Sequence, residues 1–466
     1  MKYNISVREF LQRSKEGSLD YLDFVAKLME KVRALDEQYN YLITIEDLTK
    51  FVSIEPTFFG LPISVKDNIC TRGIQSTAGS KILEGYIPHF DATAVERLRS
   101  EGARVLGKTQ QDEFGFGTFS VNSAYGVPKN PYDPARSCGG SSGGAAGLVA
   151  ALSMPHAALA ESTGGSISCP ASFCGVVGLT PTYGLVSRYG LIDYANSLDK
   201  IGVIGKHVHD VALIFSYIAG NDARDSTSLN VKKQDYTKYA AKKDLSGLRI
   251  GVPKDYFQNV DERVSKEVWH AIERLESLGA SYNEFSLPTT KYALAAYYII
   301  ATAEASTNLA KYCGMRYGLH LELHGNFNEY FSSVRAQGLG AEAKRRVILG
   351  TFARMSGYRD AYYLKAMQVR TLIIKDFKKA FSKYDVIAAP TMPILPPRFD
   401  EIAKLTPLQH YQMDVLTVPA NLAGIPHLSI NCGFSNNMPV GLHLLGDHLQ
   451  ESKLIETAAA FEREMK

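Results

Sequence analysis

The chain has 466 residues, 45% of them hydrophobic and 21% charged, which is the composition of a globular protein with a large core. A net charge of +3 is small for this length and gives no reason to expect nucleic-acid binding through bulk charge. Six cysteines lie scattered without a C-x-x-C pair, which favours reduced thiols in a cytoplasmic protein over disulfides or a metal site.

The chain lacks an apolar run long enough for a membrane span, and its N-terminus lacks the apolar core of a signal peptide. Acidic residues near the start, Glu9 and Glu16, also argue against a transit peptide. A cytoplasmic location is therefore expected, with the mitochondrial matrix as the alternative for a eukaryotic source.

The first half of the chain shows alternating helix and strand patterns. Ser6-Val-Arg-Glu9 is typical of a capping box, and residues 6–40 carry apolar residues at helical spacing. Leu61–Val65 is predicted to be a short apolar strand that ends at Lys66. Three further elements follow: a helix at Ala94–Leu98, a strand at Ala103–Leu106 and an Ala-rich helix at Leu148–Leu152.

The second half contains strands that flank a long helical region. Strands are predicted at Leu248–Val252, Asp385–Ala389 and Leu428–Cys432, and an amphipathic helix at Glu262–Leu278. Residues of about 285–370 carry almost no strand signal, and helices are predicted at Tyr292–Leu309 and Ala341–Ile374. We therefore expect an α/β fold in a single domain, residues 1–466, with a helical insertion or cap at about 285–370.

Two motif matches lack the structural context that their functions need. Gly102–Thr109 fits the phosphate-binding P-loop pattern, but its central residues form a strand-like apolar stretch where a P-loop needs a flexible loop. Gly139–Gly143 fits the nucleophile-elbow pattern, but a turn-rich polar segment precedes it in place of a buried strand. Neither match predicts function, and we expect structural or surface roles for the histidines: His207, His209, His410 and His427.

Two Gly/Ser clusters, Gly139–Gly144 and Thr163–Ser166, lie downstream of Lys66. Glycines around a serine let backbone N–H groups turn toward one point, where they can stabilise an oxyanion. A serine there can be a nucleophile if a base takes its proton, and a lysine is a base only in the neutral form that burial favours. A flexible linker is the alternative, but apolar segments continue on both sides.

Four motifs in this order resemble those of the amidase signature family, over nearly the whole chain. They are Ser64-Val-Lys66-Asp-Asn68, Gly139-Gly-Ser-Ser-Gly-Gly144, Thr163-Gly-Gly-Ser166-Ile and Cys174–Gly184. The resemblance implies a large mixed central β-sheet flanked by helices on both faces. It also implies a Ser–cis-Ser–Lys triad: Ser166 as the nucleophile that forms an acyl ester, Ser141 as the bridging serine in a cis peptide, and Lys66 as the base. The backbone N–H groups of the oxyanion hole would come from Thr163, Gly164, Gly165 and Ser166.

Segments outside these motifs resemble the branch of the family that supplies the glutamine-hydrolysing component of tRNA-dependent amidotransferases. They include Gly107–Gly117, Val186–Leu191, Glu304–Leu309 and Lys344–Phe352. In that branch, ammonia from glutamine travels to a B subunit that uses ATP and Mg to convert Glu-tRNA(Gln), Asp-tRNA(Asn) or both. A small C subunit straps the two together. The resemblance implies these partners, tRNA contact mainly through the B subunit, and no cofactor or metal in this chain.

Glutamine presents a carboxylate and an ammonium at its α-carbon, which suit a guanidinium and a carboxylate respectively. The positions that resemble the family's glutamine-binding residues are Arg346, Asp414 and Tyr297.

The chain departs from the family pattern beside the nucleophile. Ser162 and Ser168 stand where the family usually has Asp and Arg. Losing one partner alone would leave an uncompensated charge, at a cost of several kcal/mol, whereas losing both would keep the site neutral. We expect the two serines to replace an ion pair that supports the loop. The segment before Ser166 is also one residue longer than usual, which leaves Ser142 as an alternative bridge, although the place of Ser141 after Gly-Gly favours Ser141.

Two other functions remain open from the sequence. A stand-alone amidase acting on a small or acyl amide would share the same core motifs. A non-catalytic assembly subunit would fit the altered loop around Ser166, but the retained Lys66, Ser141 and Ser166 argue against it.

Overall fold

The computed structural model describes residues 3–50 and 57–465, and at its centre is an 11-stranded sheet in the order β1-β3-β2-β4-β6-β5-β10-β11-β9-β7-β8. Its strands are β1 (Leu42–Ile45), β2 (Pro62–Lys66), β3 (Arg104–Thr109), β4 (Ala157–Ser162), β5 (Val177–Thr180), β6 (Lys200–Gly205), β7 (Arg249–Pro253), β8 (Ser281–Phe285), β9 (Val386–Pro390), β10 (His427–Ser435) and β11 (Met438–Leu445). Parallel and antiparallel pairs both occur, so the predicted large mixed sheet of an α/β protein is confirmed.

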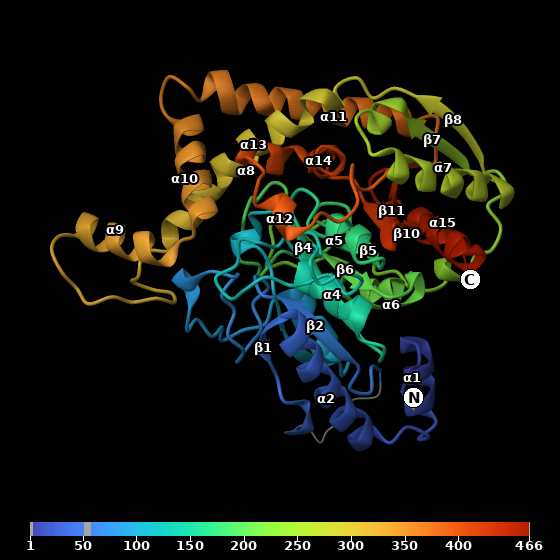
Figure 1. The fold of residues 1–466 in the computed structure, drawn as a ribbon, viewed down its shortest axis with the longest axis horizontal. Helices are drawn as coiled ribbons and strands as arrows, with labels where there is room; N and C mark the ends of the chain where they lie inside the picture. Colours follow the sequence, from blue (N-terminus) through green and yellow to red (C-terminus); the bar gives the residue numbers. More distant parts are fainter. Residues whose placement is uncertain (1–2, 51–56, 466) are drawn as a thin grey trace.

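Helices surround this sheet (Figure 1). They are α1 (Val7–Lys15), α2 (Tyr21–Tyr39), α3 (Thr93–Ser100), α4 (Gly143–Ala151), α5 (Ser168–Phe173), α6 (Val208–Ile218), α7 (Glu262–Ser277), α8 (Ala293–Asn308), α9 (Phe327–Gly338), α10 (Ala341–Arg354), α11 (Lys365–Phe381), α12 (Phe399–Ile402), α13 (Pro407–Gln412), α14 (Val418–Ala423) and α15 (Glu451–Glu464). No helix in the described residues is both long and apolar enough to cross a membrane.

Strand pairing brings two chemically important strand ends together. β2 pairs in parallel with β3 on one side and with β4 on the other, so all three strands end at the same edge of the sheet. Lys66 is the last residue of β2, and Glu161 and Ser162 are the last residues of β4. Side chains from separate parts of the sequence therefore meet where these parallel strands end.

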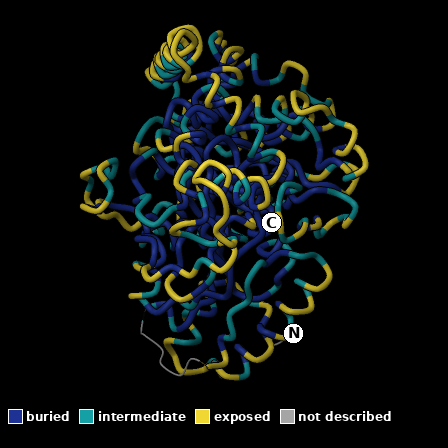
Figure 2. Tube along the Cα trace, turned by 90° about the vertical axis from the view of Figure 1, so that its left-hand side faces the viewer, coloured by how far each residue is buried: buried dark blue, intermediate teal, exposed yellow. Residues whose placement is uncertain are grey.

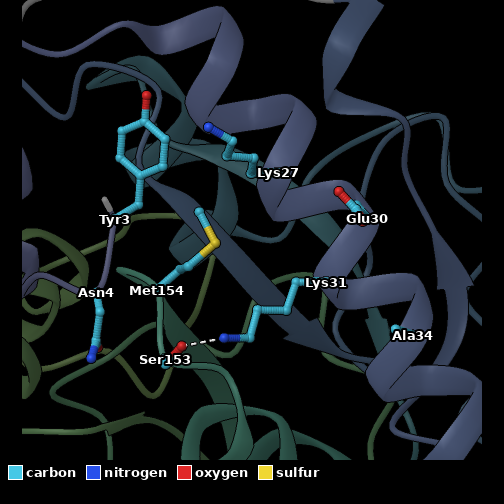
Figure 3. A pocket seen from close by; sticks show the side chains of 8 residues that line it. All are labelled: Tyr3, Asn4, Lys27, Glu30, Lys31, Ala34, Ser153 and Met154. Carbon is cyan, nitrogen blue, oxygen red and sulfur yellow. Dashed lines mark hydrogen bonds between the residues drawn. The ribbon is translucent and has the colours of Figure 1, made fainter. Parts of the chain in front are cut away.

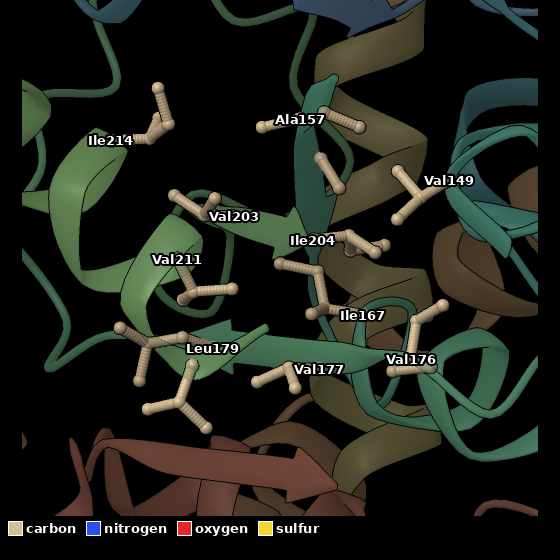
Figure 4. Packing of buried hydrophobic residues seen from close by; sticks show 14 of the residues in the cluster. Val149, Ala157, Ile167, Val176, Val177, Leu179, Val203, Ile204, Val211 and Ile214 are labelled. Carbon is tan, nitrogen blue, oxygen red and sulfur yellow. The ribbon is translucent and has the colours of Figure 1, made fainter. Parts of the chain in front are cut away.

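The core on both faces of the central strands consists of small and branched apolar side chains. Val203 and Leu179 face Val211 of α6, while Ile204 lies on the opposite face near Ile167 (Figure 4). Buried residues gather in the interior of the molecule, and exposed residues lie on its outer loops and helices (Figure 2). This packing fixes the strands that carry the site.

The predicted helical region contains α8, α9 and α10 and continues into α11 along the upper edge of the molecule in Figure 1. Within the described residues, no strand lies between β8 and β9. The expected helix at Ala341–Ile374 is wrong in one respect, because the chain leaves the helix after Arg354 and re-enters it through a π-helix at Asp360–Leu364. Gly357 has φ +88°, a left-handed conformation that interrupts the helix.

The N-terminal segment likewise forms two helices. Gly17, at φ +68°, separates α1 from α2. Ser6 caps α1 by accepting a hydrogen bond from the N–H of Glu9 at 3.1 Å, as the capping pattern predicted. The Glu9 side chain, however, contacts Arg13.

Candidate active site

Lys66 has a completely buried side chain at the end of β2. Its Nζ lies 2.7 Å from Ser141 Oγ, 2.8 Å from Glu161 Oε2 and 3.0 Å from the carbonyl oxygen of Glu161. The sequence placed Lys66 at a buried strand end, and the structure adds an acidic neighbour that the sequence did not reveal.

The first Gly/Ser cluster holds Ser141 against Lys66. The Gly140–Ser141 peptide bond is cis. A side chain at Gly140 would lie 2.3 Å from Asp112 Oδ2 and 2.7 Å from the backbone nitrogen of Phe119, so only glycine fits. Ser142, the alternative bridge, points its hydroxyl to the Glu161 carbonyl at 3.2 Å and makes no hydrogen bond to Lys66 within the described chain. The contact to Lys66 thus belongs to Ser141.

The second cluster forms a tight turn between β4 and α5 that contains Ser166. A Cβ at Gly164 would lie 2.4 Å from the Tyr297 hydroxyl, and one at Gly165 would lie 2.3 Å from Thr417 Oγ1. Among the described residues, no acceptor is found for the N–H groups of Gly164, Gly165 or Ser166. These N–H groups can therefore bind a ligand oxygen. Ser166 is 6% exposed, and its carbonyl accepts from the N–H of Ser142 at 3.2 Å, which joins the two clusters.

A buried carboxylate pair supports this turn. Thr163 Oγ1 lies 2.7 Å from Glu161 Oε1 and 2.7 Å from Asp199 Oδ1. Asp199 Oδ2 accepts from the backbone N–H groups of Tyr194 and Ala195, both at 2.9 Å. Burial and the neighbouring Glu161 carboxylate raise the pKa of Asp199 well above its ordinary value. Burial therefore favours the protonated form of Asp199.

Ser162 and Ser168, which were expected to replace an ion pair, lie among buried titratable groups and do not contact each other. Ser162 pairs with Lys200 across β4 and β6, and both are buried. With Lys66, Glu161 and Asp199, Lys200 makes the region rich in buried titratable groups. Ser168 does not contact Ser162; its hydroxyl lies 3.0 Å from His427 Nδ1. Ser162 Oγ and Lys200 Nζ have no hydrogen-bond partner among the described residues.

His427 is buried, unlike the surface histidine that the sequence allowed. Its Nδ1 also lies 3.0 Å from Nε2 of His443. Burial, His443 and Lys200 together hold the pKa of His427 well below its ordinary value, and burial lowers the pKa of His443 to about 3. Both rings are therefore neutral at pH 7.

Arg346, on α10, is buried with 3% of its surface exposed. Its Nε donates to Glu342 Oε1 at 2.8 Å and its Nη1 to the Tyr194 hydroxyl at 2.5 Å. Four aromatic rings surround its guanidinium at 5.1–5.6 Å from their centroids: Phe116, Tyr194, Tyr298 and Tyr411. Two bonds leave further guanidinium N–H groups for a ligand.

Asp414 receives the Tyr298 hydroxyl at 2.5 Å and the Thr118 hydroxyl at 2.9 Å. Burial raises the pKa of its carboxyl. Thr118 also accepts, through its carbonyl, from the N–H of Gly140 at 2.6 Å, which links this acid to the cis-peptide loop. Tyr297 is buried with its hydroxyl beside Gly164. The sequence analysis did not identify Tyr298 as a site residue, because no sequence pattern distinguishes it from the neighbouring Tyr297.

Thr118 and Arg346 line one cleft, of about 290 Å³, together with Gly117, Asn122, Glu342, Arg345, Leu405, Pro407, His410 and Tyr411. A larger hollow of about 480 Å³ lies elsewhere, between α2 and the Ser153–Met154 turn, where Lys31 contacts Ser153 (Figure 3). None of the predicted site residues lines that hollow.

The structure explains why the P-loop match carries no function. Residues Arg104–Thr109 form β3, and Lys108 is fully buried, with Nζ donating to the Ile69 carbonyl at 2.5 Å and to Ser76 at 2.7 Å. This lysine therefore cannot reach a phosphate. In the described residues no cluster of His, Cys, Asp and Glu is arranged to hold a metal ion.

Comparison with known proteins places this site in a family context. The Amidase family model matches residues 7–455. The chain is similar to the A subunit of the glutamyl-tRNA(Gln) amidotransferase of Methanococcoides burtonii, with 51% identity over 87% of this chain and 84% of that protein. It is 47% identical to the protein of the same name from Halothermothrix orenii, over 98% and 96% of the two chains.

Solved structures of related proteins have the same fold. The A subunit of the glutamyl-tRNA(Gln) amidotransferase of Thermotoga maritima superposes with a TM-score of 0.83 at 38% identity, covering 98% of this chain and 94% of that one. The peptide amidase of Stenotrophomonas maltophilia superposes with a TM-score of 0.81 at 28% identity, covering 98% and 96%.

Proposed function

Because the chain belongs to the amidase family, we propose that it is the glutamine-hydrolysing A subunit of a tRNA-dependent amidotransferase. The full-length similarity to proteins named as the A subunit of the glutamyl-tRNA(Gln) amidotransferase supports this assignment within the family. The observation that carries it is a buried guanidinium, that of Arg346, and a buried carboxylate, that of Asp414, which Thr118 links to the loop that holds Ser141 against Lys66.

In the proposed reaction, Ser166 attacks the side-chain amide of glutamine. The Ser166 proton passes to Ser141, whose own proton passes to the neutral amine of Lys66. The N–H groups of Thr163, Gly164, Gly165 and Ser166 stabilise the oxyanion of the tetrahedral intermediate. Its collapse breaks the C–N bond, and the relay returns a proton so that ammonia leaves. Water then hydrolyses the acyl ester on Ser166 by the reverse sequence, releasing glutamate.

Glutamine would be oriented by its α-carbon groups. The free N–H groups of Arg346 suit the carboxylate, and Asp414 suits the ammonium. The third predicted residue, Tyr297, lies beside Gly164 and would bound the reacting end. No cofactor or metal is required for this serine–lysine chemistry.

The ammonia would pass to a B subunit that uses ATP and Mg to act on the mischarged aminoacyl-tRNA, with a small C subunit holding the assembly together in the cytoplasm. The relatives described above are subunits of an amidotransferase, which supports the presence of partner subunits. The near-neutral net charge of +3 agrees with tRNA contact mainly through the B subunit.

The alternative is a stand-alone amidase, which the likeness to a peptide amidase favours. One assay separates the two: release of ammonia from glutamine by the full-length chain, with and without candidate B and C subunits and charged tRNA. We expect glutaminase activity only in the complex, lost in Ser166→Ala. Robust hydrolysis of other amides by the isolated chain would favour the alternative, and no activity in any combination would leave a non-catalytic assembly subunit.

A further inference from the structure

We propose that Glu161 is a positioning residue that aims the amine of Lys66 at Ser141. The inference rests on the proposed amide hydrolysis and adds a residue that the Ser166–Ser141–Lys66 relay does not include. Glu161 has 1% of its surface exposed and contacts Lys66 through both its side chain and its backbone carbonyl.

The geometry of a lysine amine explains the effect. Nζ has four positions, one bonded to carbon and three that carry hydrogens or a lone pair. Glu161 occupies two of them, with its carbonyl at 3.0 Å and its Oε2 at 2.8 Å. Ser141 Oγ, at 2.7 Å, takes the third. When Lys66 is neutral, its two N–H groups donate to Glu161, and the lone pair points at the hydroxyl whose proton it must accept.

The Glu161 carboxylate is itself held in place. Its Oε2 also accepts from Asn68 Nδ2 at 3.1 Å. Its Oε1 meets the Thr163 hydroxyl at 2.7 Å, which lies equally close to Asp199. A hydroxyl has one proton and cannot donate to two carboxylates, so one acid must donate to it. Two backbone N–H groups already point at the other Asp199 oxygen. Burial raises the pKa of Asp199, so we take Asp199 as the acid that donates through Oδ1 to Thr163, and Thr163 then donates to Glu161.

This chain of hydrogen bonds joins the base to the oxyanion turn. The backbone of Thr163 carries one of the proposed oxyanion N–H groups, and its side chain holds Glu161 in place. The same hydrogen bonds therefore orient the lone pair of Lys66 and position the turn that contains Ser166. Three titratable groups on neighbouring elements interact electrostatically with Lys66 or Glu161: Asp112, which follows β3, Asp199, which precedes β6, and Lys200 on β6. Arg188 interacts in the same way with Asp199, and Arg370 with Lys200.

The test compares Glu161→Gln with Glu161→Ala in the full-length chain, assayed with its partner subunits. Glutamine keeps an acceptor oxygen for the Lys66 amine and therefore most of its orientation. We expect its kcat to fall by less than about tenfold, with little change in KM. Alanine removes the orientation, and we expect kcat to fall by about 100-fold with little change in KM.

A matched control is Glu451→Gln on α15, which replaces another carboxylate with 1% exposure, one that accepts from the N–H of Thr182 at 2.8 Å. It should leave kcat in place even where it lowers stability. An alanine variant of Glu161 with wild-type kcat, or a glutamine variant as impaired as the alanine variant, would overturn the proposal.

A second readout does not depend on glutamine. A fluorophosphonate phosphonylates an activated serine and releases fluoride, so its rate of attachment to Ser166, followed by intact mass, reports the relay alone. We expect Glu161→Ala to lose most of this reactivity and Glu161→Gln to keep most of it. If wild-type Ser166 reacts and Glu161→Ala does not, while glutamine is never hydrolysed, the positioning role stands and the glutaminase assignment fails.

Discussion

Gly164 lies against the phenol of Tyr297 so closely that a Cβ on residue 164 would be 2.4 Å from the hydroxyl oxygen. Tyr297 comes from α8, whereas Gly164 belongs to the turn that follows β4. The helical region therefore packs directly against the turn that contains Ser166.

Gly164→Ala tests this contact. The added methyl group must displace either Tyr297 or the turn, and the proposed oxyanion N–H groups would then move. We expect glutaminase kcat to fall by about 100-fold or more, with a near-normal circular dichroism spectrum. The control is Gly446→Ala, where a Cβ would approach no atom closer than 3.3 Å and activity should persist. An active Gly164→Ala enzyme would show that the turn is not the oxyanion site.

Ser141→Ala and Ser142→Ala separate the two neighbouring hydroxyls. Only Ser141 contacts Lys66, so its loss interrupts the proposed proton relay, while Ser142 contacts a carbonyl. We expect kcat to fall by about 100- to 10,000-fold for Ser141→Ala and by less than about tenfold for Ser142→Ala. Steady-state ammonia release measures both, and the reverse ranking would assign the bridge to Ser142.

Arg346→Lys and Arg345→Lys are a matched pair on consecutive positions of α10. The Arg346 guanidinium is buried among aromatic rings, and the Arg345 side chain is 41% exposed. A lysine cannot reproduce the planar fork, so Arg346→Lys should raise the KM for glutamine by about tenfold or more, with a smaller effect on kcat. Arg345→Lys should change KM by less than about threefold. Equal KM values would exclude Arg346 from binding the α-carboxylate.

Lys200→Met should change how stability depends on pH. Burial lowers the pKa of Lys200 to about 7, from 10.5 in an unfolded chain. Between these two values the unfolded chain binds a proton that the native protein does not. The free energy of unfolding of the wild type therefore rises with pH across this range, and it is lowest at and below pH 7, where the native protein must also hold the charge.

Methionine removes this titration together with an amine that has no hydrogen-bond partner among the described residues. We expect the variant to be more stable below neutral pH, by on the order of 2 kcal/mol, and to lose the rise toward alkaline pH. Urea unfolding at several pH values measures the free energy of unfolding of each variant. The control is Lys378→Met, which replaces a half-exposed lysine and should keep the wild-type dependence of stability on pH. An unchanged slope in Lys200→Met would contradict the argument.

The elements that could be predicted from the sequence are those with strong local patterns. The apolar strand before Lys66 and the amphipathic helix α7 appear within one or two residues of their predicted positions. β4 was not predicted, because three of the six residues of Ala157–Ser162 are alanines, which have a low strand propensity. Its position between β2 and β6 is set by tertiary packing.

For the site, too, only the features with a local sequence pattern could be predicted. Glycine clusters and a lysine at a strand end are local signals, and the structure brings Lys66, Ser141 and the Ser166 turn together. Glu161 lies 95 positions from Lys66 in the chain, and no local pattern pairs them. An acidic residue at the end of an apolar stretch was the available signal. For a similar reason the hypothesis about Ser162 and Ser168 compared two positions only and did not include Lys200 on the adjacent strand.

The residues proposed for bond breaking all lie within residues 66–166, on or beside β2 and β4, whereas those proposed to hold glutamine come from α8, α10 and the segment before α14. Chemistry and recognition thus occupy separate stretches of one polypeptide that meet at Gly164 and Thr118. Substitutions or insertions in the later stretch can change which amide is accepted while leaving the reacting groups intact. A single sheet could in this way serve enzymes with very different substrates.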